Sequence, residues 1–470
     1  MKRARWTLVW MSAAWMGACG GGGGGGGSPT GTGGVTVTGT GGTGAVATGG
    51  MLATGGTLGT GGTLGTGGSG PAGPPGAFAL IGPVQASSAQ SLTPQLSWQP
   101  AFGATAYAVE IATTPDFGNA DVYAQVVDAT TTALVVPATT LVSGVVYYWR
   151  VSAENGSDYT VATGAPQWFS SPYLLDGAHG LAVTPDGGEV VVASNVNDGP
   201  IGLIDLTTHT VAGIQTGVHS TPIGVAVAPD GKHALATLLT DGAGGPNGVA
   251  VIDLQQNTFV DWIDDPCVGT TLSDVAYFPN GAAAMPDLGP DCASMGLSAF
   301  TPDPTNPYFS FTNLHDTNDP FDVAIDPTGA FALVTMELDR KLYRIDFGVS
   351  VTNYTLSGSS AGVAIAPSGQ LAVVAENTLD LLDLTTGEIN PVQLDQDTPG
   401  TDIHNVAITP DGQVAAVVGT SSIQFVSLPD GAILAAYPAA NGSSVAIAPD
   451  GSTAFVSDRA DGWVRVVPIP

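Results

Sequence analysis

Hydrophobic and polar residues alternate in short runs through most of the chain, and one alternating run returns again and again. It reads IGVAVAPDGKHALAT from Ile223, and variants of it begin at His179, Phe321, Ala361 and His404. Each variant places a run such as GVAVA before a Pro-x-Gly turn and a run such as HALAT after it. A period of two is typical of a β-strand, and Pro followed by Gly favours a tight turn. The repeat therefore predicts pairs of antiparallel strands.

Seven copies can be aligned on the turn proline, at intervals of 39 to 50 residues. The aligned residues are Pro185, Pro229, Pro279, Pro327, Pro367, Pro410 and Pro449. Further runs such as VAVIDL and TVAGIQ follow within a copy, which predicts four strands in each. This period and strand number are typical of β-propeller blades. We therefore predict an all-β chain with a seven-bladed β-propeller over residues 173–470.

Alanine occupies the middle of the first strand in every copy. The column contains Ala182, Ala226, Ala276, Ala324, Ala364, Ala407 and Ala446. Because side chains alternate across a strand, we interpret this column as a packing requirement where neighbouring blades approach closely. The last copy ends after three strands, so we expect the segment 173–175 to supply its fourth strand and to close the ring.

The pattern V-A-V-x-P-D-G, followed by V-x-V-I-D and Thr, resembles the YVTN family of seven-bladed propellers of archaeal and bacterial surface proteins. The chain departs from that pattern at VVAS from 191, at FVSD from 455 and in the third copy, AYFPNGAAAMPD. Aspartates also end several third strands before Thr-rich turns. We interpret these residues, Asp205, Asp253, Asp346 and Asp383, as turn formers and not as catalysts.

A second all-β segment precedes the repeats. Alternating runs such as YAVEIATTPDF and LVSGVVYYWRVSAEN predict a β-sandwich over residues 80–172, which resembles a fibronectin type III domain. The residues that carry the resemblance are Trp98, Tyr107, Val109, Ile111, Leu141, Gly144, Tyr148, Arg150, Val151, Ala153 and Trp168. We expect Trp98 and Trp168 to be core residues, and sugar binding by either is the alternative.

The N-terminus has the features of an export signal. Lys2, Arg3 and Arg5 precede an apolar run over 6–16, and small residues then lead to Cys19. This junction resembles the lipobox of bacterial lipoproteins, which implies a signal peptide over 1–18, lipidation of Cys19 and anchoring to the bacterial cell envelope, at the outer membrane or cell surface. An ordinary secretion signal, or an intracellular chain with an apolar start, is the alternative. The Gly/Thr-rich residues 19–76 predict a disordered tether.

The charge of the chain limits the classes of partner that it could bind, and its cysteine content bears on disulfide formation. The segment after residue 18 carries seven Lys and Arg against forty Asp and Glu. It has no basic cluster that could displace counterions from nucleic acid, so we expect no nucleic-acid partner. An envelope protein or a carbohydrate, neither identified by the sequence, remains as a partner beside the membrane itself. In an exported chain, Cys267 and Cys292 could form a disulfide, and two separate buried thiols are the alternative.

The mouth of the propeller channel is the candidate site. Residues entering the first strands there include His179, Asp274, Asp322, His404 and Asn405. Two aspartates on adjacent blades could converge and, with an amide or water, suit Ca²⁺. The favoured alternative is that they accept hydrogen bonds from backbone amides.

The sequence contains no recognisable catalytic site. We therefore expect a lipid-anchored binding or scaffold protein without a cofactor. The alternative is a metal-dependent hydrolase or lactonase centred on the channel, as in some seven-bladed propellers.

Overall fold

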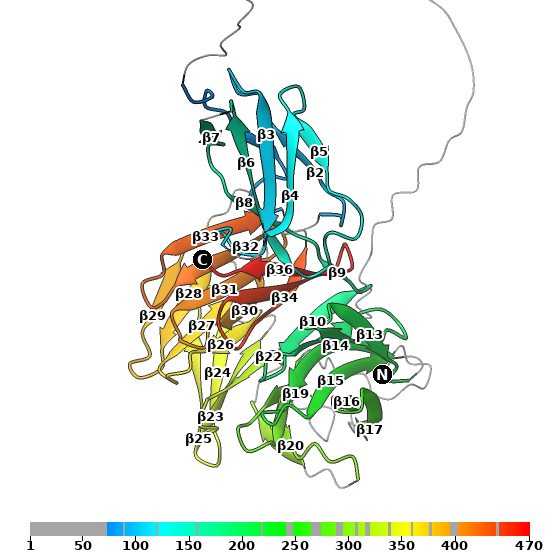
Figure 1. The fold of residues 1–470 in the computed structure, drawn as a ribbon. Coiled ribbons are helices and arrows are strands. Elements are labelled where there is room, and N and C mark those ends of the chain that lie inside the picture. Colours follow the sequence, from blue (N-terminus) through cyan, green and yellow to red (C-terminus); the bar gives the residue numbers. More distant parts are fainter. Residues whose placement is uncertain are drawn as a thin grey trace, which may run out of the picture. The chain divides into compact units, whose positions relative to one another are not determined.

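The computed structural model describes residues 73–470 except 88–89, 119–120, 157, 218–219, 241–247, 265–273, 288–294, 306–308, 315–319, 337–339, 359–360, 376–377, 395–402 and 439–440. The expected signal peptide and all of the expected tether before residue 73 lie outside these residues. Every regular element in the described part of the chain is a β-strand, and these strands form nine sheets (Figure 1). The same residues contain no helix long and apolar enough to cross a membrane.

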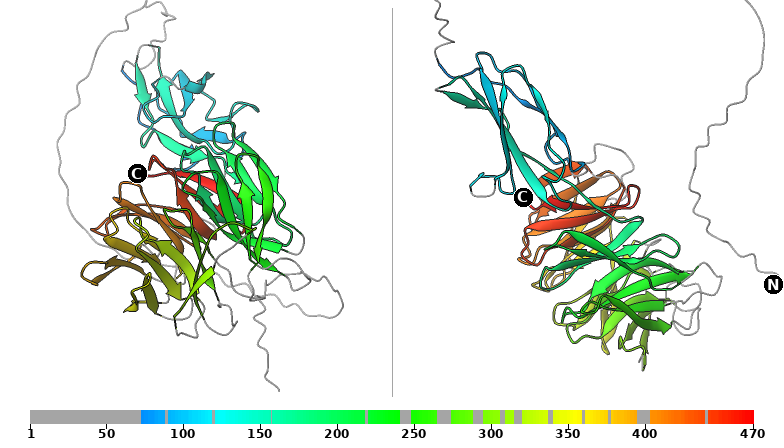
Figure 2. Two further views of the ribbon diagram at one scale, coloured as in Figure 1. Left: turned by 90° about the horizontal axis from the view of Figure 1, so that it is seen from below. Right: turned by 45° about the vertical axis from the view of Figure 1, so that its right-hand side comes forward.

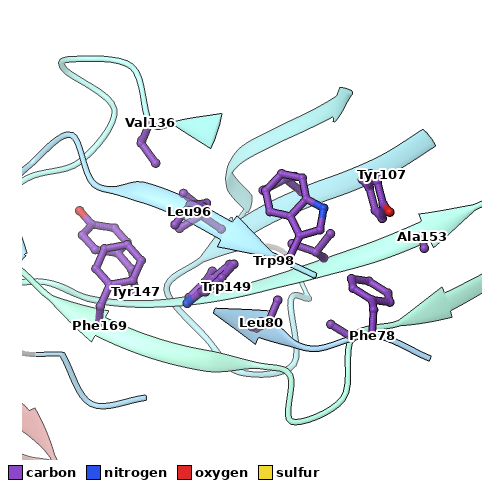
Figure 3. Close-up of a cluster of buried hydrophobic side chains, with 14 of the residues drawn as sticks. Phe78, Leu80, Leu96, Trp98, Tyr107, Val136, Tyr147, Trp149, Ala153 and Phe169 are labelled. Carbon is purple, nitrogen blue, oxygen red and sulfur yellow. The ribbon is translucent and has the colours of Figure 1, made fainter. Parts of the chain in front are cut away.

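Residues 80–170 fold into two β-sheets around a shared core. The first sheet contains β1 (Leu80–Gly82), β2 (Gln95–Trp98) and β5 (Ala133–Val135). The second contains β4 (Asp121–Asp128), β3 (Ala106–Ala112), β6 (Val146–Glu154), β7 (Tyr159–Val161) and β8 (Gln167–Ser170), which pairs with β6. Trp98, Tyr107 and Trp149 lie in the core between the sheets (Figure 3). The alternating runs of this segment therefore bury one face of each sheet, as expected for a sandwich.

Strand β6 corrects one detail of the sequence pattern. Tyr148 carried the resemblance to the fibronectin domain, but Tyr147 is the buried tyrosine, with an exposed fraction of 2%. Its hydroxyl accepts a hydrogen bond from the Val142 N–H at 2.9 Å. Arg150 lies on the outer face, where it pairs with Glu110 at 2.7 Å. The period of two puts every second residue of β6 in the core, and two adjacent tyrosines left the choice of face open.

The remaining seven sheets each have four antiparallel strands and follow one another in chain order. Blades 1 to 4 are β10 (Ala178–Val183), β11 (Glu189–Ser194), β12 (Ile201–Asp205) and β13 (Thr210–Ile214); β14 (Ser220–Val227), β15 (His233–Thr240), β16 (Gly248–Asp253) and β17 (Thr258–Asp264); β18 (Ala276–Tyr277), β19 (Ala283–Asp287), β20 (Gly296–Phe300) and β21 (Phe309–Asn313); β22 (Pro320–Ile325), β23 (Phe331–Met336), β24 (Lys341–Asp346) and β25 (Ser350–Thr355). Blades 5 to 7 are β26 (Val363–Ile365), β27 (Leu371–Ala375), β28 (Leu379–Asp383) and β29 (Ile389–Val392); β30 (Ile403–Ile408), β31 (Val414–Gly419), β32 (Ser422–Ser427) and β33 (Ile433–Pro438); β34 (Gly442–Ile447), β35 (Thr453–Asp458), β36 (Trp463–Pro468) and β9 (Tyr173–Leu174).

The propeller core is divided into seams, by which we mean the contacts between consecutive blades. Seven clusters of buried residues lie in the described part of the propeller, one at each seam. Each seam receives the column alanine of one blade and the residue after the alanine of the next. Ala182 and Val227 meet in this way between blades 1 and 2. The alanine column therefore packs across the seams, as the strand alternation predicted.

The Pro-x-Gly turns also connect neighbouring blades. The turn glycine of every copy has a positive φ, between 68° and 86°, which an L side chain rarely adopts. A Cβ on Gly231 of blade 2 would lie 3.5 Å from Cδ of Pro185 of blade 1. A Cβ on Gly187 of blade 1 would lie at the same distance from Cδ of Pro449 of blade 7. The turn of blade 1 therefore lies against the turn of blade 7 in the same way as the turn of blade 2 lies against that of blade 1.

Blade 7 is completed by a strand from the other end of the propeller. Tyr173 and Leu174 of β9 pair with Val464 and Trp463 of β36. Ala446 of blade 7 then packs in one cluster with Val183 of blade 1, and Figure 2 shows the last blade, in red, beside the first, in green. The expected donation of an outer strand by 173–175 is confirmed for its first two residues. We call the contact between blades 7 and 1 the closing seam.

The two tryptophans that the sequence assigned to the sandwich core are both buried, but in different places. Trp98 lies in the sandwich core. Trp168 packs instead with residues of blades 6 and 7, and its ring meets Tyr437 edge-on with 5.3 Å between centroids. Strand β8 therefore presents one side to the propeller, a contact that the sequence of the sandwich alone could not indicate.

Candidate functional site

The inner strands are irregular at the predicted channel-mouth column. In five blades the pairing of the first two strands changes register there: between Ala178 and Leu181, Pro222 and Val225, Pro320 and Val323, Ile403 and Asn405, and Gly442 and Ser444. A β-bulge takes backbone groups out of the ladder, so other groups have to satisfy them. The chemistry of the column is therefore decided by how these backbone groups are satisfied.

Hydroxyl groups on the second strands satisfy some of the backbone groups at these bulges. Thr237 Oγ1 accepts a hydrogen bond from the Gly224 N–H at 2.8 Å, and Thr335 Oγ1 accepts one from the Asp322 N–H at 3.0 Å. Thr335 also donates to the carbonyl of Ala361 on the next blade at 3.1 Å. These hydroxyls therefore hold the bulge of their own blade, and Thr335 also joins the next.

Ser457 plays the same part at the closing seam. Its hydroxyl accepts a hydrogen bond from the Ser444 N–H at 2.9 Å and donates to the carbonyl of His179 on blade 1. The sequence interpretation missed these three hydroxyls. Their signal was the Thr or Ser near the end of each second strand, in HALAT, ALVT and AFVS.

Asp322 and Asn405 direct their oxygens at the following blade. Asp322 Oδ2 accepts a hydrogen bond from the Val363 N–H at 2.7 Å, and Asn405 Oδ1 accepts one from the Val445 N–H at 3.4 Å. Asp322 Oδ1 also accepts a hydrogen bond from the N–H of its neighbour Val323 at 2.8 Å, and the exposed fraction of Asp322 is only 6%. These side chains therefore connect inner strands to backbone N–H groups, the role that the sequence alternative gave them.

Asp274 and Asp322, on blades 3 and 4, come together at this column. Their carboxyl groups are hydrogen-bonded to each other, and the N–H groups of Val275 and Val323 also donate to Asp274. Burial raises the pKa of Asp274 well above its ordinary value, and the charge and hydrogen bond of Asp322 raise it further. A bond between two carboxyl groups requires a proton, and the raised pKa of Asp274 favours a proton on that residue.

One of the two histidines of the column has a described side chain. His179 Nδ1 donates to the carbonyl of Ile223 on blade 2 at 3.2 Å. His404 lies in β30, and its side chain is outside the described part of the structure. Cys19, Cys267 and Cys292 also lie outside the described residues, so the expected lipidation and disulfide stay predictions.

The donor set at the column does not fit Ca²⁺. Both oxygens of Asp322 accept N–H groups, and the Asp274 carboxyl interacts with Asp322 and with the N–H groups of Val275 and Val323, the second of which it shares with Asp322. Calcium prefers six to eight oxygen ligands, several of them carboxylates or carbonyls turned toward the ion. Among the described residues, no three His, Cys, Asp or Glu side chains are grouped so that they could hold a metal ion.

The aspartates at the ends of third strands act on turns. Asp205 Oδ1 accepts from the N–H groups of Thr207 and Thr208, both at 2.8 Å, and these bonds lower the pKa of Asp205. Asp253 and Asp383 cap equivalent turns. Asp346 pairs instead with Arg344 at 3.0 Å. Three of the four turn aspartates therefore bind backbone in the way that the sequence predicted.

Solved structures with a similar fold are β-propellers. The chain is similar to hydrazine synthase of Kuenenia stuttgartiensis, with 18% identity, a TM-score of 0.54, and coverage of 63% of this chain and 96% of that one. It is also similar to the β-propeller domain of Cps50 (Swd1) of Myceliophteria thermophila, with 13% identity, a TM-score of 0.52, and coverage of 64% and 99%. No protein-family model and no curated protein matches the chain. At these identities the likeness shows the β-propeller fold alone.

Proposed function

We propose that the chain is a lipid-anchored protein of the bacterial cell envelope whose sandwich and propeller serve as binding or scaffolding surfaces. The observation that carries this proposal is the use of the channel-mouth column. Asp274, Asp322 and Asn405 turn their oxygens toward each other or toward backbone N–H groups. Side-chain oxygens that are used in this way hold neighbouring blades together, which favours a structural role for these residues.

The sandwich supports the assignment of a fibronectin type III-like module. Its sheets have the strand orders β1-β2-β5 and β4-β3-β6-β7. The Tyr147 hydroxyl bonds to the backbone of Val142, five residues upstream, which resembles the tyrosine corner of immunoglobulin-like sandwiches. A fold alone does not imply a function, so this assignment is compatible with a binding or scaffolding role and does not choose a partner.

The anchor can be tested on the full chain expressed in a Gram-negative host. We expect metabolic labelling with a fatty acid to mark the wild-type protein and to leave Cys19→Ser unmarked. The variant should also pass from the membrane fraction to the soluble exported fraction. Equal labelling of both proteins, or an unlabelled wild type, would contradict the lipid anchor.

The catalytic alternative is tested by metal analysis of the purified mature chain. Bound calcium should be far below one ion per molecule in the wild type, in Asp274→Ala and in Asp322→Ala. One ion in the wild type that both variants lose would overturn the binding proposal in favour of a channel-centred hydrolase or lactonase. The Asp230→Ala variant, which changes an exposed turn carboxylate on blade 2, is the control for general loss of acidity.

A further inference from the structure

The closing seam receives residues from the sandwich as well as from two blades. Val146, at the start of β6, packs against the closing-seam cluster. Ser170, at the end of β8, donates its hydroxyl to the carbonyl of Val466 in β36 at 2.9 Å. The Gly144 N–H donates to the carbonyl of Ser171 at 2.6 Å, just before β9 begins. The sandwich therefore contacts both strands that close blade 7, β9 and β36 (Figure 1).

Tyr173 joins three parts of the molecule at this place. Its backbone pairs with Val464 of blade 7, and its side chain is 1% exposed within the closing-seam cluster. Its hydroxyl lies 3.0 Å from Nδ1 of His209 on blade 1, and the two rings are stacked. Its ring also fills the space beside Gly144 of the sandwich, where a Cβ would lie 1.9 Å from Tyr173 Cζ.

The length of β9 explains why the closing seam needs this support. The outer strands of the other six blades have four to seven residues, whereas β9 has two. A two-residue ladder offers few backbone hydrogen bonds, and each contributes only about 1 kcal/mol net. Strand pairing alone therefore holds β9 much less firmly than the other outer strands.

We propose that the sandwich is a clamp that keeps the propeller ring closed. It covers the closing seam with Val146, fastens β36 through Ser170, and holds the ring of Tyr173 beside Gly144. The sandwich is then a structural part of the propeller. Opening of the ring should begin where the clamp is loosened.

Two glycine variants of the full chain test the clamp. Gly144 and Gly164 both lie in the sandwich with positive φ values of 74° and 77°. A Cβ on Gly144 would collide with Tyr173, whereas a Cβ on Gly164 meets nothing within 4 Å. Gly144→Ala and Gly164→Ala therefore carry the same backbone strain, and only the first displaces the tyrosine ring.

The measurement is amide hydrogen exchange, resolved along the chain. We expect Gly144→Ala to speed exchange in β9, β10 and β36 by about tenfold or more, and Gly164→Ala to leave these strands unchanged. Equal exchange of these strands in both variants, or faster exchange confined to the sandwich in Gly144→Ala, would overturn the clamp.

Two adjacent serines keep the test decisive if Gly144→Ala does not fold. The hydroxyl of Ser170 reaches blade 7, and that of Ser171 donates within the sandwich to the Gln90 carbonyl at 2.7 Å. We expect Ser170→Ala to speed exchange in β36 by about fivefold and Ser171→Ala to leave it unchanged. The same exchange rate in β36 for both serine variants would contradict the proposal.

Discussion

The closing seam and the seam between blades 3 and 4 each join two neighbouring blades, but different side chains make the contacts. Between blades 3 and 4 the carboxyl groups of Asp274 and Asp322 interact with each other and with backbone N–H groups. At the closing seam, blade 7 is built from both ends of the propeller, and Tyr173 of β9 pairs with β36 and packs in the cluster there. The repeated motif fixes where blades meet, and residues outside the motif decide how strongly each pair is joined.

The largest expected loss of stability comes from breaking an ion pair in blade 7, and an ion pair in blade 4 is the comparison. Arg465 of β36 pairs with Asp458 at 2.7 Å, with side-chain exposures of 8% and 0%. Removal of one partner leaves a buried charge, so Arg465→Ala should lower the free energy of unfolding by about 3–5 kcal/mol. Arg344→Ala breaks a pair with Asp346 whose side chains are 22% and 27% exposed, so it should cost about 1 kcal/mol or less.

Urea unfolding of both arginine variants measures this difference. The midpoint should fall much further for Arg465→Ala than for Arg344→Ala, with equal m-values if unfolding stays two-state. Similar midpoints for the two variants would mean that blade 7, which contains β9, depends on its ion pair no more than blade 4 does.

The next effect concerns the seam between blades 3 and 4. Asp322→Ala removes the acceptors of two N–H groups, those of Val323 and Val363, and the partner of Asp274. We expect the free energy of unfolding to fall by about 2–3 kcal/mol, because buried donors lose a charged acceptor. Asp230→Ala removes only the exposed acceptor of the Lys232 N–H, 3.0 Å away. Its loss in free energy of unfolding should be a few tenths of the loss expected for Asp322→Ala. Thermal unfolding of both variants decides the point, and equal losses would contradict it.

Much of the fold could be predicted from the sequence because its rules are local. Alternation with a period of two placed Ala182 and its equivalents at the seams, and a missing fourth strand identified the segment from Tyr173 as its donor. The prediction of which residue faces the core failed where the alternation did not decide between two adjacent residues. Tyr147 and Tyr148 are adjacent and chemically alike, so only the structure shows which one faces the core.

The candidate site was less predictable because it depends on geometry between blades. The shared column on adjacent blades suggested that Asp274 and Asp322 could converge, and the two carboxyl groups interact in the structure. The sequence could not show that the strand bulges beside them turn N–H groups toward their oxygens, or that Thr335 would join two blades. The contact of Trp168 with Tyr437 was hidden for a similar reason, since it joins segments far apart in the chain.

The proton between Asp274 and Asp322 should make stability depend on pH. The raised pKa of Asp274 means that the folded chain holds a proton that the unfolded chain releases above about pH 3.8. This contribution is full below that pH and is lost as the pH rises toward the folded pKa, by up to about 1.4 kcal/mol per pH unit. Asp274→Asn keeps a donor toward Asp322 and cannot titrate. Its stability relative to wild type should therefore rise with pH.

Urea unfolding at a series of pH values from 4 to 8 measures that difference. The exposed aspartates whose pKa is lowered, such as Asp186 and Asp411, are present in both proteins and cancel in the comparison. A constant difference between wild type and Asp274→Asn across the series would show that no proton is held between the two carboxyl groups.

The smallest effect compares two hydroxyls with the same local role at different seams. Thr335 accepts the Asp322 N–H and donates to Ala361 of the next blade. Ser457 accepts the Ser444 N–H and donates to His179 across the closing seam. Thr335→Val and Ser457→Ala should each lower the free energy of unfolding by about 1 kcal/mol.

Their local effects should differ because blades 4 and 5 are continuous in the chain, whereas blade 7 is assembled from β34–β36 and the distant strand β9. The strands of blades 4 and 5 belong to one continuous stretch of chain, whereas blade 7 is held together between β36 and β9 by non-covalent contacts alone. Amide exchange in β9 and β10 should therefore speed up in Ser457→Ala, and exchange in β22 and β26 should change less in Thr335→Val. An equal local response at both seams would mean that the blade assembled from two chain segments is as cooperative as a continuous one.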